Sequence, residues 1–157
     1  MSRSYRAATP DDAGFMKLAI EQARLGLAEG GVPIGAALVV NGTVIAVGRN
    51  RRVQQNSAIR HGETDCLENA GRQPASVYAS ATMYTTLSPC AMCSGAILLY
   101  KIRRVVIGES TTFTGAEDWL AAHGVELVQM DDPECKDLMK LFITNYPDIW
   151  NEDIGHE

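Results

Sequence analysis

The sequence lacks any apolar run long enough to span a membrane. Its longest candidates, Ile34–Val40 and Ala96–Tyr100, fall well short of the roughly 18 residues that cross a bilayer. No apolar segment follows the first six residues, as it would in a secretory signal. We therefore expect a cytoplasmic protein without membrane partners.

Positive charge is also scarce. The chain has 14 Lys and Arg against 19 Asp and Glu, for a net charge of -5. This balance argues against a protein that grips a nucleic-acid backbone. Four arginines nevertheless lie close together in the sequence: Arg49, Arg51, Arg52 and Arg60. They belong either to a solvated loop or to a small basic patch. The length of 157 residues and a hydrophobic share of 46% fit one globular domain over residues 1–157.

Cysteine is infrequent, with four residues in the chain. In a reducing compartment a Cys-x-x-Cys pair more often binds a metal or reacts in redox chemistry than forms a structural disulfide. Cys90 and Cys93 have this spacing. Cys66 and Cys135 stand alone, and we expect both to be buried as small hydrophobic residues.

Hydrophobic patterns predict strands that alternate with helices. The first predicted element is a helix over Asp11–Glu29, which Asp11 or Asp12 can cap. Its apolar face consists of Phe15, Leu18, Ala19, Leu25 and Leu27. An Asn41-Gly42 turn then joins two strands, Ile34–Val40 and Thr43–Gly48, in a hairpin. Residues 50–60 read as a loop, and the tail from Tyr146 reads as one short helix.

Further strands are predicted at Ala81–Thr86, Arg103–Gly108 and Val125–Met130, and further helices at His61–Asn69, Cys90–Tyr100, Glu117–Ala122 and Pro133–Ile143. This alternation predicts an α/β fold, a three-layer α/β/α sandwich. Its central five-stranded mixed sheet combines the antiparallel hairpin with three parallel strands, and helices cover both faces.

The Cys-x-x-Cys pair opens a predicted helix. Residues three apart on a helix lie on one side, so the sulfurs of Cys90 and Cys93 point the same way. The helix N-terminus favours the thiolate form. His61, at the start of another predicted helix, is the natural third ligand. Catalytic zinc takes three protein ligands and keeps one open position, which this set provides.

Glu63 lies two residues after His61, where it reaches a metal-bound water and not the metal. A carboxylate there shuttles protons while the zinc-bound hydroxide attacks. The pattern His-x-Glu with Pro-Cys-x-x-Cys is typical of zinc deaminases of nucleobases. The alternative without catalysis is a zinc site that stabilises an interaction module.

Several segments resemble the small fungal-type cytosine deaminases of the cytidine deaminase-like superfamily. The matching pieces span nearly the whole chain: residues 29–35, 61–63, 67–69, 84–90, 92–93 and 150–155. The resemblance implies a cytidine deaminase-like fold, a homodimer with one Zn²⁺ per subunit, and hydrolysis of cytosine to uracil and ammonia.

The resemblance also implies roles for individual residues. His61, Cys90 and Cys93 become zinc ligands, and Glu63 becomes the proton shuttle. The implied substrate-binding residues are Asn50, the backbone N–H of Gly62, Asp153, the aromatic lid of Phe113 and Trp150, and the pocket walls Ile34 and Leu87.

The chain departs from this family at Asn151, where the family has an aromatic residue, and in the loop Ser110–Gly115. Substrate choice therefore stays open between cytosine, isocytosine, and guanine or another purine. A tRNA adenosine deaminase shares the metal motif. Two features argue against a tRNA adenosine deaminase. One is the net negative charge of the chain, and the other is the tail, residues 146–157, which we expect to close over the pocket.

Overall fold

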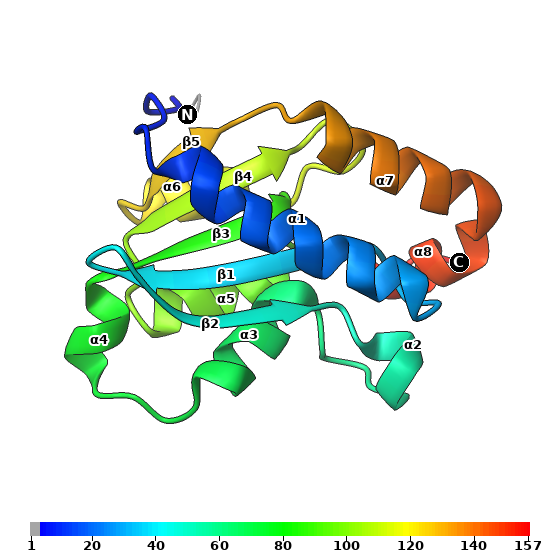
Figure 1. The fold of residues 1–157 in the computed structure, drawn as a ribbon, viewed down its shortest axis with the longest axis horizontal. Helices are drawn as coiled ribbons and strands as arrows, with labels where there is room; N and C mark the ends of the chain where they lie inside the picture. Colours follow the sequence, from blue (N-terminus) through cyan, green and yellow to red (C-terminus); the bar gives the residue numbers. More distant parts are fainter. Residues whose placement is uncertain (1–3) are drawn as a thin grey trace.

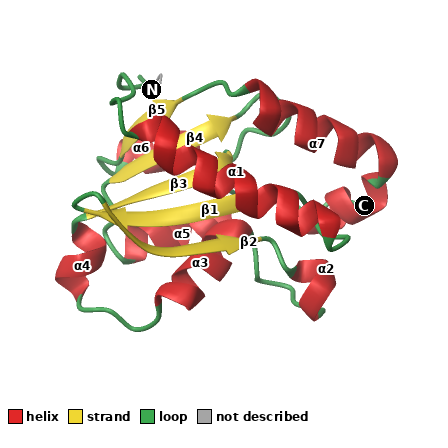
Figure 2. Ribbon diagram, in the orientation of Figure 1, coloured by secondary structure: helices red, strands yellow, loops and turns green. Residues whose placement is uncertain are grey.

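A computed structural model describes residues 4–157; residues 1–3, part of the N-terminal segment considered above, lie outside the described residues. A mixed sheet of five strands forms the centre, in the order β2-β1-β3-β4-β5 (Figures 1 and 2). The strands are β1 (Gly35–Val40), β2 (Thr43–Arg49), β3 (Ala81–Leu87), β4 (Arg104–Glu109) and β5 (Glu126–Gln129). The helices are α1 (Asp12–Ala28), α2 (Arg52–Gln55), α3 (Gly62–Ala70), α4 (Ala75–Ala79), α5 (Ala91–Leu99), α6 (Glu117–Ala122), α7 (Pro133–Asn145) and α8 (Pro147–Asp153).

The strand directions confirm the predicted mixed sheet. β1 runs antiparallel to both β2 and β3, whereas β3, β4 and β5 are parallel. The hairpin turns at Asn41 and Gly42, whose φ angles of 50° and 76° match the turn that Asn-Gly favours. The predicted strands and long helices thus occur with boundaries displaced by at most two residues.

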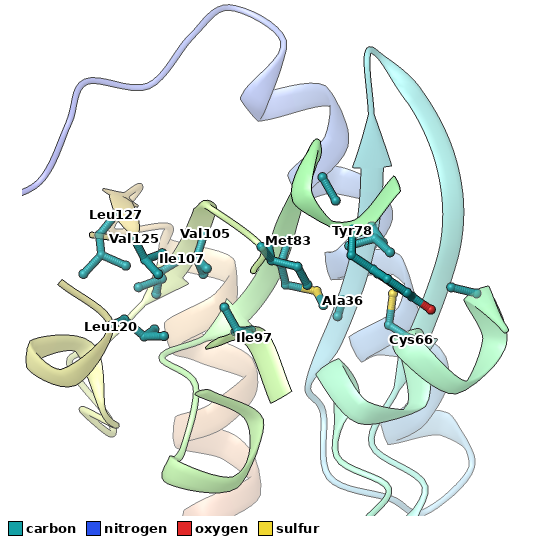
Figure 3. Packing of buried hydrophobic residues seen from close by; sticks show 14 residues of the cluster. Ala36, Cys66, Tyr78, Met83, Ile97, Val105, Ile107, Leu120, Val125 and Leu127 are labelled. Atoms are coloured by element: carbon teal, nitrogen blue, oxygen red, sulfur yellow. The ribbon is translucent and has the colours of Figure 1, made fainter. Parts of the chain in front are cut away.

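Helices cover both faces of the sheet, as the three-layer prediction requires. α1 and α7 lie over one face, and α3, α5 and α6 lie over the other (Figures 1 and 2). Between the sheet and the second group lies the larger apolar core, which includes Leu38, Met83, Ile97, Ile107 and Leu120 (Figure 3). The core against α1 is separate and smaller.

Several local predictions were wrong. Residues 50–60 contain one helical turn, α2, which begins where the Asn50 side chain accepts a bond from the Arg52 amide at 3.1 Å. α4 was not predicted. A single turn presents no repeating apolar face, so hydrophobic periodicity does not reveal it.

The apolar face of α1 also differs from its prediction. Its buried stripe runs through Met16, Ala19, Ile20 and Ala23, while Leu25 is exposed. Neither Asp11 nor Asp12 caps the helix through its side chain. Within residues 4–157, no helix is both long enough and apolar enough to span a membrane.

Candidate metal centre and pocket

Two helix N-termini bring the predicted ligands together. His61 precedes α3 and Cys90 precedes α5, each as an extended N-cap residue. The Thr64 hydroxyl fixes the first of these ends by accepting a bond from the His61 amide at 2.9 Å. At the second end, the Ser94 amide donates to the Cys90 carbonyl at 2.8 Å. The structure thus brings together the three side chains that the sequence nominates as ligands.

The donor atoms are spaced as a zinc ion requires. The Nδ1 atom of His61 lies 3.4 Å from the sulfur of Cys90 and 3.7 Å from that of Cys93. Ligand atoms around a tetrahedral zinc with ordinary bond lengths lie about 3.5–3.8 Å apart. Within residues 4–157, no other group of three or more His, Cys, Asp or Glu side chains could hold an ion.

The protein groups themselves favour a thiolate at this centre. Hydrogen bonds from Cys93 and His61 lower the pKa of Cys90 against the opposing effect of burial. The hydrogen bond to Cys90, together with burial, raises the pKa of Cys93. Cys90 thus supplies one thiolate at neutral pH. A bound Zn²⁺ would favour the thiolate form of Cys93 as well.

Glu63 lies beside this centre on α3. It is 3% exposed, and its Oε1 atom accepts a hydrogen bond of 2.7 Å from the Thr85 hydroxyl on β3. Burial raises the pKa of the Glu63 carboxyl. A carboxyl group with a raised pKa is suited to accept and return a proton near neutral pH.

A small pocket opens onto Glu63, and half of the residues that line it are apolar. Ligand sites typically combine apolar walls with a few polar groups, and this pocket has both. Phe113 and Trp150 meet over it edge to face, with ring centroids 5.7 Å apart. The remaining lining residues are Ile34, His61, Leu87, Ser88, Cys90, Asp153 and Ile154.

Asp153 joins the tail to the metal centre. Its Oδ1 atom accepts a bond of 2.7 Å from Asn50 Nδ2, and its Oδ2 atom lies 3.5 Å from His61 Nε2. Burial raises the pKa of Asp153, although His61 and Asn50 oppose this shift. Asn50 is buried behind Asp153 and is not among the described residues that line the pocket.

Gly62 is the first residue of α3, a position whose N–H has no acceptor within the helix. A Cβ atom there would stand 3.2 Å from both the Cγ2 atom and the carbonyl oxygen of Ile34. The absence of a side chain therefore lets the pocket wall approach the start of the helix closely.

Sequence reasoning missed three residues of this region: Thr85, Ser88 and Ile154. Ser88 donates to the buried Glu117 and accepts from the Gly115 amide at 2.9 Å, which ties β3 to the loop that follows β4. A serine directly before the Pro-Cys-x-x-Cys motif was a usable signal, because the motif fixes its place. Ile154 carried no comparable signal.

The loop Ser110–Gly115 is ordered by Glu109, a buried residue at the end of β4. Its carboxylate accepts bonds from the amides of Thr111 and Thr112, at 2.7 and 2.9 Å, and from the Thr112 hydroxyl. This turn carries Phe113 over the pocket. Asn151, the other departure from the family, is not among the described residues that line the pocket.

The arginines near residue 50 form no free basic patch. Arg51 and Arg60 pair with the buried Asp65 at 3.0 and 2.9 Å, and Arg49 pairs with Glu29 at 2.8 Å. Arg52 lies 3.5 Å from Glu152 of the tail. Their charges are thus used to hold residues 49–60 against α1, α3 and α8.

The mixed sheet, the paired helix ends and the buried glutamate together define a class, the zinc-binding deaminases. The chain belongs to the family described as the cytidine and deoxycytidylate deaminase zinc-binding region, whose model matches residues 9–109. Phe113 and residues 150–154 lie outside this matched region.

Known relatives support this assignment. A cytosine deaminase from Candida albicans is 51% identical over 148 residues, covering 94% of this chain and 99% of the relative. A tRNA-specific adenosine deaminase from Bacillus subtilis is 40% identical over 98 residues, covering 62% and 61%. A solved structure from a study of A-to-I editing by tRNA:A34 deaminases superimposes with a TM-score of 0.70 at 30% identity, covering 80% and 99%.

Proposed function

We propose that this chain hydrolyses the amino group of a free nucleobase, converting cytosine and water to uracil and ammonia. The observation that carries the proposal is the buried Glu63 beside the His61, Cys90 and Cys93 donors, in a pocket that Phe113 and Trp150 also line. The Candida relative, which aligns over 94% of this chain, supports cytosine as the first choice.

His61, Cys90 and Cys93 would hold the zinc, which when bound acidifies water so that it attacks at neutral pH. Glu63 takes a proton from the attacking water and delivers it to the ring nitrogen. It later passes a proton to the departing amine, so that ammonia leaves. The raised pKa of Glu63, caused mainly by burial, supports this role in both directions.

Groups in and behind the pocket suit a pyrimidine edge. Asp153, which lines the pocket, would accept from the amino group or ring N–H. Asn50, buried behind Asp153, and the backbone N–H of Gly62 would have to reach the carbonyl side from outside the lining. The Asn50 side chain donates one N–H to Asp153, and its oxygen accepts one bond from the Arg52 amide. One N–H and one lone pair of the Asn50 amide are therefore left for a base. Phe113, Trp150, Ile34 and Leu87 enclose the ring and exclude water.

Isocytosine exchanges the amino and carbonyl substituents of cytosine, and a purine adds a second ring. Phe113 and Trp150 meet over the pocket, which favours a single ring, and Asn151 is not among the described residues that line it. For a tRNA substrate, the anticodon would need a basic surface around the pocket. The paired arginines at 49, 51 and 60 do not supply one.

We further propose a cytoplasmic homodimer that acts in pyrimidine salvage. Each subunit is a single domain over residues 1–157, with the tail 146–157 closing its pocket. An exposed apolar face on α5 and α6 supports the dimer: Met92, Leu99, Tyr100 and Trp119. A helix that is apolar on all sides is usually covered, and a second copy would cover this one.

The test measures ammonia release by zinc-loaded protein from cytosine, isocytosine and guanine, for the wild type and Glu63→Gln. We expect cytosine to be the best substrate. Glu63→Gln should lower turnover by about 10²- to 10⁴-fold while zinc content stays at one ion per chain. Glu68→Gln, on an exposed position of the same helix, is the matched control and should behave as the wild type.

Each outcome decides a different part of the proposal. Release of ammonia from isocytosine or guanine alone would keep the reaction and reject cytosine. No release from any base, together with a Glu63→Gln variant unchanged in every property, would support a zinc-stabilised interaction module instead.

A further inference from the structure

One face of β3 presents a single hydroxyl among apolar side chains. Alternate residues of β3 face α3 and α5: Ala81, Met83, Thr85 and Leu87, all buried. Ala81 and Met83 belong to the main apolar core (Figure 3). Valine has nearly the shape of threonine, so packing alone does not require a hydroxyl at residue 85.

The hydroxyl of Thr85 has a specific partner. It lies 2.7 Å from Glu63 Oε1 and 3.0 Å from the Leu87 carbonyl oxygen. A hydroxyl carries one hydrogen, and a bond to a carboxylate is the stronger of the two choices. Thr85 is fully buried and Glu63 nearly so, so water competes poorly for this contact.

Glu63 therefore depends on β3 for its orientation. Its backbone is set by α3, but its carboxylate is at the end of a flexible side chain. Thr85 reaches it from a strand at the centre of the sheet, bonded to β1 on one side and β4 on the other. A strand in this position moves little, so it is a firm support for a group that must meet a ring nitrogen.

We propose that Thr85 is a positioning residue that holds the Glu63 carboxylate toward the pocket. The proposal rests on the deaminase function proposed above, because it assigns Glu63 a part in the reaction. Thr85 itself is not among the described residues that line the pocket. Its loss should therefore slow the reaction without weakening the binding of the base.

The test compares Thr85→Val, Thr85→Ser and the wild type in kcat, KM and zinc content. We expect Thr85→Val to lower kcat by about 10- to 100-fold, the scale of a lost hydrogen bond to a charged group. KM should change by less than about twofold and zinc content should not change. Thr85→Ser retains the hydroxyl and should restore most of kcat.

Thr86→Val is the matched control. Thr86 is also a buried threonine of β3, and its hydroxyl accepts a bond from the Gly35 amide at 3.1 Å on the other side of the strand. This variant should lose stability and keep kcat. If Thr85→Val fails to fold, Thr85→Ala replaces it in the test. The proposal then requires a higher kcat for Thr85→Ser than for Thr85→Ala.

A second measurement does not depend on activity. In urea unfolding, Thr85→Val should lower the midpoint more in the wild type than in a Glu63→Ala background, because the contact is already lost there. Equal kcat in Thr85→Val and the wild type would overturn the proposal. If the wild type releases no ammonia from any base, the proposed function fails, while the unfolding cycle still tests the contact.

Discussion

Burial raises the pKa of the Cys66 and Cys135 thiols, whereas hydrogen bonds from Cys93 and His61 lower that of Cys90. The same side chain thus has opposite chemistry in two environments. The two lone cysteines are buried and free, as expected from their isolation in the sequence. Cys90 differs from both because of the residues around it.

This contrast predicts the order of alkylation. After zinc is removed by a chelator, iodoacetamide at pH 7 should modify Cys90 at least about tenfold faster than Cys66 or Cys135, because the thiolate is the reactive form. Added zinc should protect Cys90 and Cys93. Mass spectrometry of each cysteine peptide measures the rates, and modification of Cys66 as fast as Cys90 in folded protein would contradict this account.

At the scale of elements, a buried ion pair ties α1 to the sheet. Asp12 accepts bonds from Arg104 of β4 at 2.6 and 2.8 Å and from the Tyr84 hydroxyl of β3 at 2.7 Å. Burial alone would raise the pKa of Asp12. The bonds from Arg104, Tyr84 and the Thr9 amide outweigh it and hold the pKa well below its ordinary value.

Asp12→Asn should lower the free energy of unfolding by about 2–4 kcal/mol at pH 7, because the two terminal nitrogens of Arg104 lose their buried carboxylate and only the bond from its Nε atom to Glu126 remains. A carboxyl group whose pKa is lowered by folding stabilises the protein at any pH above the ordinary aspartate pKa. This stabilisation is lost as the pH falls toward the lower pKa of the folded state. The difference between variant and wild type in urea unfolding should thus persist to about pH 4 and shrink below it. A difference that stays constant to pH 3 would rule out the ion pair as its source.

The elements differ in how far the sequence predicts them. Long strands and helices repeat an apolar pattern, and the Asn41-Gly42 turn has its own chemistry, so both are readable. α2 and α4 are single turns without a repeating face. Asp12 was misread as a cap because its partners lie 72 and 92 residues away.

At the scale of the whole molecule, the outer surface of α5 and α6 exposes large apolar side chains. α5 and α6 lie on the side of the sheet opposite α1 and α7 (Figure 2). Leu99 of α5, Tyr100 directly after it and Trp119 of α6 are exposed. We expect Leu99→Glu to convert the proposed dimer to a monomer, because Leu99 is 70% exposed and a charge there would be buried on association.

Light scattering or sedimentation at micromolar concentration measures the mass. Leu141→Glu is the matched control, since Leu141 is 52% exposed on α7, at the opposite face, and should leave the mass unchanged. A wild-type protein that is monomeric throughout this range would remove the dimer from the proposal.

The sequence by itself determined the candidate metal donors, the glutamate that we propose as acid and base, and the alternation of strands and helices. Each of these depends on local spacing: His61 and Glu63 two apart, Cys90 and Cys93 three apart, and apolar residues at helical or strand periods. Such patterns are visible along one chain because the residues that make them are neighbours.

Only the tertiary structure decided how Glu63 is supported and how the pocket is closed. Thr85 meets Glu63 across 22 residues, and Asn50 meets Asp153 across 103. These contacts form because β3 lies beneath α3, and because α7 and α8 return the end of the chain to the metal centre. No local pattern specifies contacts at that separation; packing of the sheet and its two helical layers does.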